Sequence, residues 1–122
     1  MKKRLSPKVL AAFATTKYLY IRSGDHRFVA VWVVVVEERV IVRSWNDKPG
    51  GWYRAFLAQP CGHVRIDDRE APVRAVPLRN QRISDAADVA YGAKYTTKAN
   101  AKYVQGFKDP GRKAATLELV PV

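Results

Sequence analysis

Cysteine is almost absent from this sequence of 122 residues, which contains only Cys61. A single cysteine cannot form an intrachain disulfide, and it cannot supply the several thiolates of a structural metal cluster. Because disulfides belong to oxidising compartments, their exclusion is typical of a protein in a reducing setting. We therefore expect a cytoplasmic protein.

Long hydrophobic segments are also missing. The longest apolar run, residues 28–36, is far shorter than the ~20 residues that a helix needs to span a bilayer. The basic start, MKKRLSPKVLAAFATT, lacks the extended apolar core of a secretory signal, because Pro7 comes early and Lys17 ends the run. The sequence predicts no membrane segment, and we expect residues 1–17 to form a short helix or an arm.

Acidic residues are few, since 11 Asp and Glu stand against 22 Lys and Arg, which gives a formal net charge of +11. A surplus of this size favours anionic partners such as nucleic acid, phosphate-bearing cofactors or acidic surfaces. A basic surface that only keeps the protein in solution explains the same numbers. The charge alone does not choose among these interpretations.

Familiar catalytic motifs are missing as well. The sequence has no Walker loop, no dinucleotide fingerprint, no serine nucleophile elbow and no pair of catalytic carboxylates. His26 and His63 lack the spacing of metal ligands. Cys61 and His63 would share a strand face, as a nucleophile and its base do, but nothing nearby supplies an oxyanion hole.

The sequence does contain a series of strand patterns. Runs rich in β-branched and aromatic residues predict about six strands, at residues 18–23, 28–36, 40–44, 63–66, 71–78 and 114–120. The run at 28–36 is apolar at every position, which is typical of a strand buried on both faces. Pro72 and Pro77 confine their strand to a sheet edge or require bulges.

Two helices are predicted between these strands. Residues 51–59 form a short helix that Pro60 ends. Ser84 is a suitable N-cap for an amphipathic helix over residues 85–95. We expect this helix to bury Ala86, Val89, Ala90 and Ala93, and we expect residues 96–113 to form a basic, irregular loop.

These elements indicate a mainly β protein with two helices. Antiparallel strands with helical insertions suit a small barrel or an α+β roll. The apolar strand at 28–36 favours the barrel, because a barrel covers a strand on both sides. The length fits one domain over residues 1–122, with the barrel at residues 18–122.

The first candidate site is the stretch VRSWNDKPGGWYRAF, residues 42–56. Unpaired N–H groups at a helix N-terminus hold phosphate or carboxylate groups, glycines allow close approach, and arginine grips an oxyanion with two bonds. Trp45 or its aromatic neighbours can stack on a flat ring. The residues that we expect to bind a cofactor here are Arg43, Ser44, Lys48, Gly50, Gly51, Trp52, Tyr53 and Arg54. An ordinary turn whose aromatic residues enter the core gives the same pattern.

A second candidate site is the helical segment DVAYGAKY. Asp88, Tyr91 and Tyr95 have the spacing of one helix face. Lys94 lies close to Tyr91 on that helix, and a Tyr–Lys pair can donate protons or bind an anionic group. We therefore include Tyr91 and Lys94 among the candidates, while half-buried tyrosine rings with hydroxyls at the rim explain the same pattern.

The order of these motifs resembles a known fold family. A hairpin that ends in Arg-Ser, a glycine-rich loop and a helix that begins Trp-Tyr resemble the split β-barrel flavin-binding proteins, the deazaflavin-dependent nitroreductases in particular. Those proteins carry a helix start like WYxNL, where this sequence has WYRAFL. The segments VWVVV, VRS, WYRA, AYGAKY and AATLELVP also resemble a small family of uncharacterised bacterial proteins, from about Val29 to Pro121.

This resemblance implies a split β-barrel like those of flavin reductases and pyridoxamine-phosphate oxidases. It implies a homodimer that binds FMN or a deazaflavin at the seam between subunits, and an oxidoreductase in which the ring does the hydride chemistry. In such proteins the first turn touches the cofactor phosphate, which by resemblance makes Arg22, Ser23 and Arg27 candidates.

Two other functions stay open. Residues 98–113 interleave Tyr103 and Phe107 with lysine and arginine, as a module that binds single-stranded nucleic acid does. The chain is also shorter than most split-barrel flavoproteins, so a non-enzymatic relative that has lost its cofactor is a third interpretation.

Overall fold

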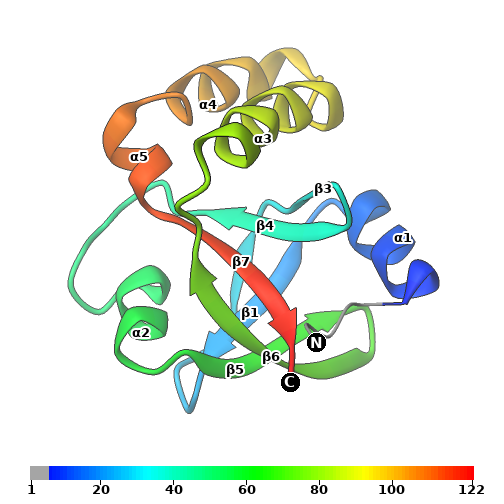
Figure 1. Ribbon diagram of the computed structural model, residues 1–122, viewed down its shortest axis with the longest axis vertical. Helices are drawn as coiled ribbons and strands as arrows, with labels where there is room; N and C mark the ends of the chain where they lie inside the picture. The colour runs from blue at the N-terminus through cyan, green and yellow to red at the C-terminus, as the bar shows by residue number, and fades with distance from the viewer. Residues whose placement is uncertain (1–5) are drawn as a thin grey trace.

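The computed structural model describes residues 6–122 and contains a seven-stranded antiparallel sheet that curls into a small split β-barrel (Figure 1). The first five residues of the expected N-terminal segment lie outside the described part. The strands follow the order β2-β1-β5-β6-β7-β4-β3 across the sheet. In chain order the elements are α1 (Pro7–Thr15), β1 (Leu19–Ser23), β2 (Val29–Val31), β3 (Val34–Val36), β4 (Arg39–Arg43), α2 (Trp52–Ala58), β5 (Cys61–Ile66), β6 (Arg69–Pro77), α3 (Gln81–Lys94), the 3-10 turn η1 (Lys98–Asn100), α4 (Ala101–Gly106), α5 (Pro110–Ala114) and β7 (Thr116–Pro121).

The apolar run at residues 28–36 forms two strands rather than one, which is why the sheet has seven strands. β2 and β3 lie at opposite edges of the sheet, yet only Trp32 and Val33 separate them in the chain. We call these two residues the seam. The Val33 amide donates a hydrogen bond to the Tyr95 hydroxyl at 3.0 Å, and the Val33 carbonyl accepts one from the Lys94 ammonium at 2.6 Å. The end of α3 thus satisfies backbone groups that a neighbouring strand would otherwise pair.

Two apolar cores lie on the two faces of β3 and β4. Inside the barrel, Phe13 of α1 and Phe56 of α2 pack against side chains of the strands. On the outer face, α3 covers Val34, Val36 and Ile41. Burial on both faces is therefore confirmed for the second half of the 28–36 run, whereas Ala30 in its first half is exposed.

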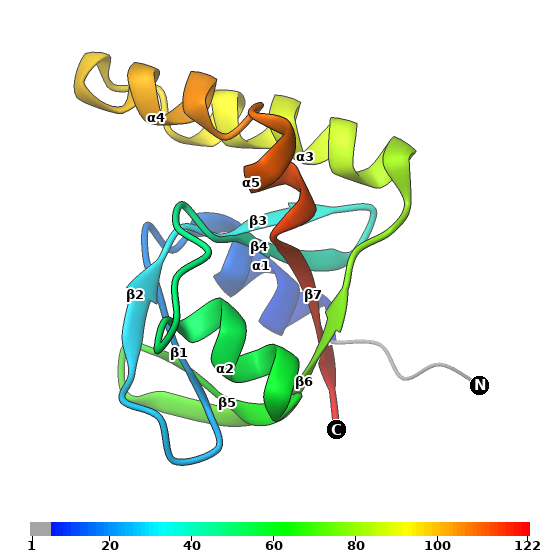
Figure 2. The ribbon, with the colours of Figure 1, turned by 90° about the vertical axis from the view of Figure 1, so that its left-hand side faces the viewer.

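The helices occupy two levels around the barrel. Figures 1 and 2 show α3 and α4 side by side above β3 and β4. The helices α1 and α2 lie at opposite flanks of the barrel, and both pack against its interior. Residues 96–113, predicted as an irregular loop, instead contain η1, α4 and α5. Asp109 caps α5, since its carboxylate accepts a hydrogen bond from the Gly111 amide at 3.0 Å. None of the helices among residues 6–122 is long and apolar enough to cross a membrane.

The start and the buried face of α3 differ from the prediction. Asn80, rather than Ser84, caps the helix, because its side chain accepts a hydrogen bond from the Ile83 amide at 3.1 Å. The predicted inward residue Val89 is 73% exposed, and Ala93 is also exposed. Because alanines occur all around this helix, they do not indicate which face is buried. The larger side chains of Ile83 and Tyr91 determine the buried face of α3. The buried residues of α3 are Ile83, Ser84, Ala87 and Tyr91.

β6 is an inner strand although it contains two prolines. It pairs with β5 through residues 69–74 and with β7 through residues 73–77. Pro72 therefore has a partner only in β5, and Pro77 only in β7. Each proline lies where β6 has one neighbour, so neither removes a bond from a two-sided ladder. The prediction that this strand lies at an edge is wrong for the strand as a whole, but each proline does have an edge environment.

Candidate functional site

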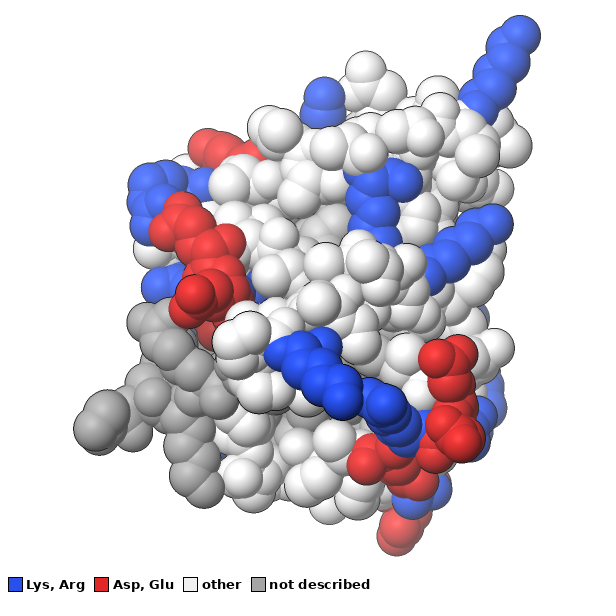
Figure 3. All heavy atoms as spheres, turned by 90° about the vertical axis from the view of Figure 1, so that its right-hand side faces the viewer, with Lys and Arg blue, Asp and Glu red and all other residues white. Residues whose placement is uncertain are grey.

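The positive charge is not gathered into one patch on the face that carries α1. Figure 3 shows lysine and arginine scattered among uncharged side chains, with two groups of acidic residues between them. Several basic residues are also paired, including Arg54 with Asp47 and Arg82 with Glu37. The hydrogen bond from Arg82 lowers the pKa of the Glu37 carboxyl. Charge alone therefore does not mark the functional surface on this face.

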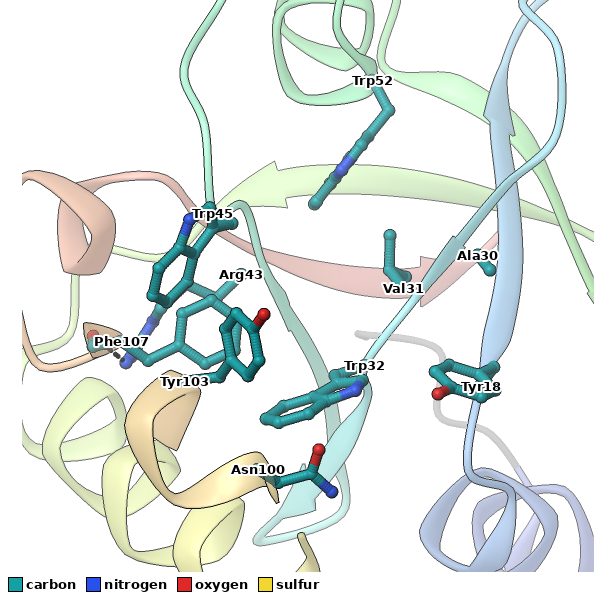
Figure 4. Close-up of a pocket in the computed structure, with 10 residues that line it drawn as sticks. All are labelled: Tyr18, Ala30, Val31, Trp32, Arg43, Trp45, Trp52, Asn100, Tyr103 and Phe107. Atoms are coloured by element: carbon teal, nitrogen blue, oxygen red, sulfur yellow. Dashed lines mark hydrogen bonds between the residues drawn. The ribbon is translucent and has the colours of Figure 1, made fainter. Parts of the chain in front are cut away.

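An aromatic pocket lies where the seam, the loop after β4 and α4 meet (Figure 4). Its cavity measures about 330 Å³. In Figure 4, Trp45, Tyr103 and Phe107 are grouped on one side, whereas Trp52 and Tyr18 approach from other directions. The lining residues are Tyr18, Ala30, Val31, Trp32, Arg43, Trp45, Trp52, Asn100, Tyr103 and Phe107. We call this cavity the ring pocket.

Ring contacts hold the walls of the ring pocket in place. Trp32 stacks on Tyr95, with ring centroids 4.0 Å apart and planes 4° apart. Trp45 meets Tyr103 edge to face at 5.2 Å. Gly106 makes room for Trp45, because a Cβ atom at Gly106 would lie 2.3 Å from the indole. The walls of the ring pocket are therefore held in position by contacts within the protein, before any ligand binds.

The electrostatics of the ring pocket suit a neutral or anionic ligand. None of the described residues that line it is acidic. Cations lie over several of its rings: Lys17 over Tyr18 at 5.5 Å, Lys102 over Tyr103 at 5.2 Å and Arg112 over Trp45 at 3.6 Å. Aromatic cages for quaternary ammonium groups use the same ring faces. Here those faces already carry cations, so a cationic ligand is disfavoured.

Arg43, which was predicted to bind a cofactor, is a structural residue in this fold. Its side chain is buried and donates five hydrogen bonds. The acceptors are Thr116 Oγ1 at 2.8 Å, Asp88 Oδ1 at 2.6 Å, Phe107 O at 2.9 Å, Ser84 O at 3.2 Å and Ser84 Oγ at 3.3 Å. Although Arg43 borders the ring pocket, its N–H groups point to these acceptors. The guanidinium therefore joins β4 to β7, α3 and the end of α4.

Three other predicted site residues are also used within the fold. The Ser23 hydroxyl donates to the Gln59 carbonyl at 2.6 Å, and the Ser44 hydroxyl donates to the Asn46 carbonyl at 2.5 Å. Tyr53 is buried, its hydroxyl donates to the Ala114 carbonyl at 3.3 Å, and burial raises the pKa of this hydroxyl.

The remaining residues of the predicted turns lie at the surface, except for Trp52. Arg27, Lys48 and Gly50 are exposed, and Arg54 is held by Asp47 at 2.6 Å. Gly51 is the N-cap of α2, and its amide donates to the Lys48 carbonyl at 3.1 Å. Arg22 lies on the outer face of β1.

The structure does bring the two predicted turns together. His26 of the first turn hydrogen bonds to the carbonyl of Gly50 in the second, at 3.1 Å. Of the residues predicted in these turns, Trp52 and Arg43 line the ring pocket.

Tyr91 and Lys94 support the fold from α3. Burial raises the pKa of the Tyr91 hydroxyl, which is fully enclosed and has no hydrogen-bond partner among the described residues. Lys94 donates to the Val33 carbonyl and to the Phe13 carbonyl, the latter at 3.1 Å. Burial lowers the pKa of Lys94 to about 8. Its ammonium group therefore ties α1 and the seam to α3.

The lowered pKa of Lys94 predicts a pH-dependent stability. A lysine in the unfolded chain titrates near ~10.4. Between pH 8 and that value the unfolded chain holds a proton that the folded protein has released, so the free energy of unfolding rises with pH. Below pH 8, Lys94 is charged in both states, and the full cost of burying its charge lowers the free energy of unfolding.

Relative to Lys94→Met, the wild type is expected to gain at most about 1 kcal/mol between about pH 7.5 and pH 10, because the group is partly exposed. Urea unfolding at a series of pH values measures this difference, and the exposed Lys98, changed to methionine, is the control. A difference between wild type and Lys94→Met that stays constant across this range would contradict the prediction.

Most residues of the ring pocket were not predicted as site residues. They come from segments that span residues 18–107, and no local motif unites them. Only the amino-acid composition could have indicated these residues, because all three tryptophans of the sequence line this pocket. The sequence named Trp45 as a stacking residue and Tyr103 and Phe107 as part of a nucleic-acid module. The lining residues that it missed altogether are Tyr18, Ala30, Val31, Trp32 and Asn100.

Comparison with known proteins agrees with the fold. The chain is similar to the crystal structure of the conserved hypothetical protein Rv2991 from Mycobacterium tuberculosis, with a TM-score of 0.65 and 10% sequence identity. The match covers 99% of this chain and 81% of that chain. At this identity the likeness shows the fold alone. No curated protein matches the sequence significantly.

The sequence itself places the chain in a family. A family model described as "Uncharacterized protein conserved in bacteria (DUF2255)" matches residues 9–119, which is most of the chain. The resemblance to an uncharacterised bacterial family, inferred from the sequence motifs, is thereby confirmed. The chain belongs to the DUF2255 family of uncharacterised proteins conserved in bacteria.

Proposed function

We propose that this protein binds a flat heteroaromatic cofactor, FMN or a deazaflavin, with its ring in the ring pocket, and acts as an oxidoreductase. One observation carries the proposal. Six aromatic side chains, including every tryptophan of the sequence, surround one cavity that has no acidic lining residue among those described. Small-molecule sites are typically apolar and aromatic, with few polar groups.

The size of the ring pocket supports a ring rather than a whole cofactor. Ligand cavities run from about 300 to 1,000 Å³, and about 330 Å³ lies at the lower end of that range. A tricyclic ring fills such a space, and a phosphorylated tail would lie outside it. The cations over Tyr18, Tyr103 and Trp45 favour a ligand with negative charge.

The protein's own contribution would be binding and orientation. The indoles of Trp32, Trp45 and Trp52 offer faces and edges to a flat ring and keep water from it. Asn100 is an uncharged polar lining residue that can hydrogen bond to ring heteroatoms. When bound, a flavin-type ring supplies the hydride transfer, which needs no acidic or basic side chain from this chain.

Tryptophan fluorescence is the direct test. Because all three tryptophans line the ring pocket, titration with FMN or a deazaflavin is expected to quench most of the tryptophan emission in a saturable way. Ligand absorbance should shift over the same concentration range. Quenching that grows linearly without saturation, with no spectral shift, would rule out a ring site.

Variants at the mouth of the ring pocket locate the binding. Tyr18 and Tyr103 are 44% and 41% exposed, so Tyr18→Ala and Tyr103→Ala should leave the fold intact. Each is expected to weaken cofactor binding by about five- to tenfold, in proportion to a lost ring contact. Leu57→Ala removes an exposed apolar side chain from α2 and should not change the affinity.

Binding of nucleic acid is the alternative function. Tyr103 and Phe107, which the sequence offered as a stacking platform, both line the ring pocket. Their position around one cavity supports a single ring as ligand more than a row of stacked bases. If no flavin binds, mobility shifts of oligonucleotides at two salt concentrations become the next measurement. If neither ligand class binds, a relative that has lost its cofactor is the remaining interpretation.

The homodimer and the cytoplasmic setting stay predictions. The exposed rings of Tyr18 and Tyr103 at the pocket mouth leave room for a second subunit to cover the cofactor. Sedimentation with and without FMN measures that association.

A further inference from the structure

Trp45 forms a wall of the ring pocket from a loop without regular secondary structure, between β4 and α2. The backbone beside it is tied to the residue before β7, since the Ser44 amide donates to the Ala115 carbonyl at 2.9 Å. Sites built on loops are held less precisely than sites built on helices or strands. The position of the Trp45 indole therefore depends on the side chains around it.

Arg112 of α5 holds both the backbone and the ring of Trp45. Its guanidinium lies over the indole, 3.6 Å from the ring centroid. From the same position, Nε donates to the Trp45 carbonyl at 3.0 Å and Nη1 donates to the Gly106 carbonyl at 3.3 Å. Arg112 is not a lining residue of the ring pocket. It therefore contacts Trp45 from outside the cavity.

Gly106 completes this arrangement at the end of α4. Because a Cβ atom at Gly106 would lie 2.3 Å from the indole, only glycine lets the Trp45 ring lie against the helix backbone. The carbonyl of the same residue accepts the second hydrogen bond from Arg112. We call Gly106 and Arg112 the tryptophan clamp.

The tryptophan clamp uses the shape of the guanidinium more than its charge. Among residues 6–122, Arg112 forms no ion pair. The nearby carboxylate of Asp109 instead caps α5, where it accepts hydrogen bonds from the amides of Gly111 and Arg112 at 3.0 Å and 3.3 Å. A planar fork can lie flat on an indole while it donates two hydrogen bonds, and a lysine ammonium cannot.

We propose that Arg112 is a positioning residue of the ring pocket, which fixes the Trp45 indole as a wall against the ligand ring. Arg112 acts through the indole and does not touch the ligand. A wall that is already in position lowers the cost of ordering side chains when a ligand binds. This inference rests on the proposed function, because it names a residue that shapes the same site.

Fluorine spectra of protein labelled with 5-fluorotryptophan test the position of Trp45 without any ligand. The three tryptophans should give one resonance each, and Trp45→Phe identifies the resonance of Trp45. In Arg112→Met, this resonance is expected to broaden, because an indole without the tryptophan clamp exchanges between several positions. The resonances of Trp32 and Trp52 should keep their wild-type shape, which shows that the variant is folded. A Trp45 resonance as sharp as in the wild type would overturn the positioning role.

Titration with FMN shows whether this position matters for binding. Arg112→Met is expected to weaken FMN binding by about fivefold, the order of one displaced aromatic contact. Lys108→Met is the matched control for charge, because Lys108 is exposed in the same basic segment and does not line the ring pocket. Its affinity for FMN should stay close to that of the wild type.

Arg112→Lys separates position from charge. Lysine keeps the charge without the planar fork, so this variant should lose as much FMN affinity as Arg112→Met and show the same broad resonance. Wild-type affinity in Arg112→Lys, or equal losses in Arg112→Met and Lys108→Met, would overturn the inference and leave the ring pocket standing. If the wild type does not bind FMN, the proposed function fails, and the fluorine spectra still decide whether Arg112 holds Trp45.

Discussion

Arg43→Met is expected to lower the free energy of unfolding by about 3–5 kcal/mol, the range for breaking a buried ion pair by removing one partner. The guanidinium bonds to Thr116 of β7, to Asp88 and Ser84 of α3 and to the Phe107 carbonyl. Its loss removes the side-chain donor from the Phe107 carbonyl and from Ser84, while Asp88 keeps only its bond from Lys113 at 2.8 Å. Urea unfolding followed by tryptophan emission and by circular dichroism measures the change.

Two further substitutions separate the buried arginine from a surface ion pair. Arg54→Met breaks the exposed pair with Asp47, which should leave the free energy of unfolding almost unchanged, because solvent screens a surface ion pair. Arg43→Lys keeps the charge but loses the planar fork, so its stability should lie between that of the wild type and that of Arg43→Met. Equal effects of methionine at positions 43 and 54 would contradict the structural role of Arg43.

Gly62→Ala is expected to destabilise the protein by about 3 kcal/mol, at the upper end of the range for inserting a methyl group into a packed site. A Cβ atom at Gly62 would lie 2.0 Å from the carbonyl oxygen of Arg22 and 3.0 Å from the ring of Phe56. The first contact is with backbone, so β1 or β5 must move and the pairing of Ser23 with Gly62 is disturbed. Thermal and urea unfolding measure the loss.

Gly92→Ala is the matched control for the glycine substitution. Gly92 lies in α3, and a Cβ there would meet only Val104 Cγ1, at an ordinary distance of 3.6 Å. Alanine should therefore stabilise the helix by up to about 1 kcal/mol, the difference in helix propensity. Among the described contacts, no closely packed atom at Gly92 opposes the substitution. Destabilisation by both alanines would show that the distance at Gly62 does not decide the outcome.

Local patterns predicted the elements well where neighbouring residues determine them. The hairpin of residues 34–36 with 39–43 and the helix after Gly51 follow from polar turn residues and from a glycine-rich loop. The start of α3 was misplaced because Ser84 and Asn80 are both good caps, and only the position of the partner amide distinguishes them. The split of the valine run could not be read from its composition, because every residue in it is a strand former.

The site was harder to predict than the fold because its parts are brought together by barrel closure. Arg43 looked like a free cation beside a glycine-rich loop. Its partners Asp88 and Thr116 lie 45 and 73 residues away in the chain, and only the fold reveals that they satisfy it. Conversely, Trp32 lay inside an apolar run that predicted burial, yet the break at the seam places it on the wall of a pocket.

Closure of the seam matters for a chain that is still being synthesised. The bond between Val33 and Tyr95 spans 62 residues, so a nascent chain must extend well beyond β3 before it can form. Contacts of such separation form slowly, since loop closure precedes any gain from them. Until α3 and β7 arrive, the backbone groups of Val33 and the β7 side of β4 lack their partners, and exposed edges recruit other chains. We therefore expect loss of Tyr95 or Lys94 to reduce the yield of soluble protein on expression more than it reduces the stability of the folded protein.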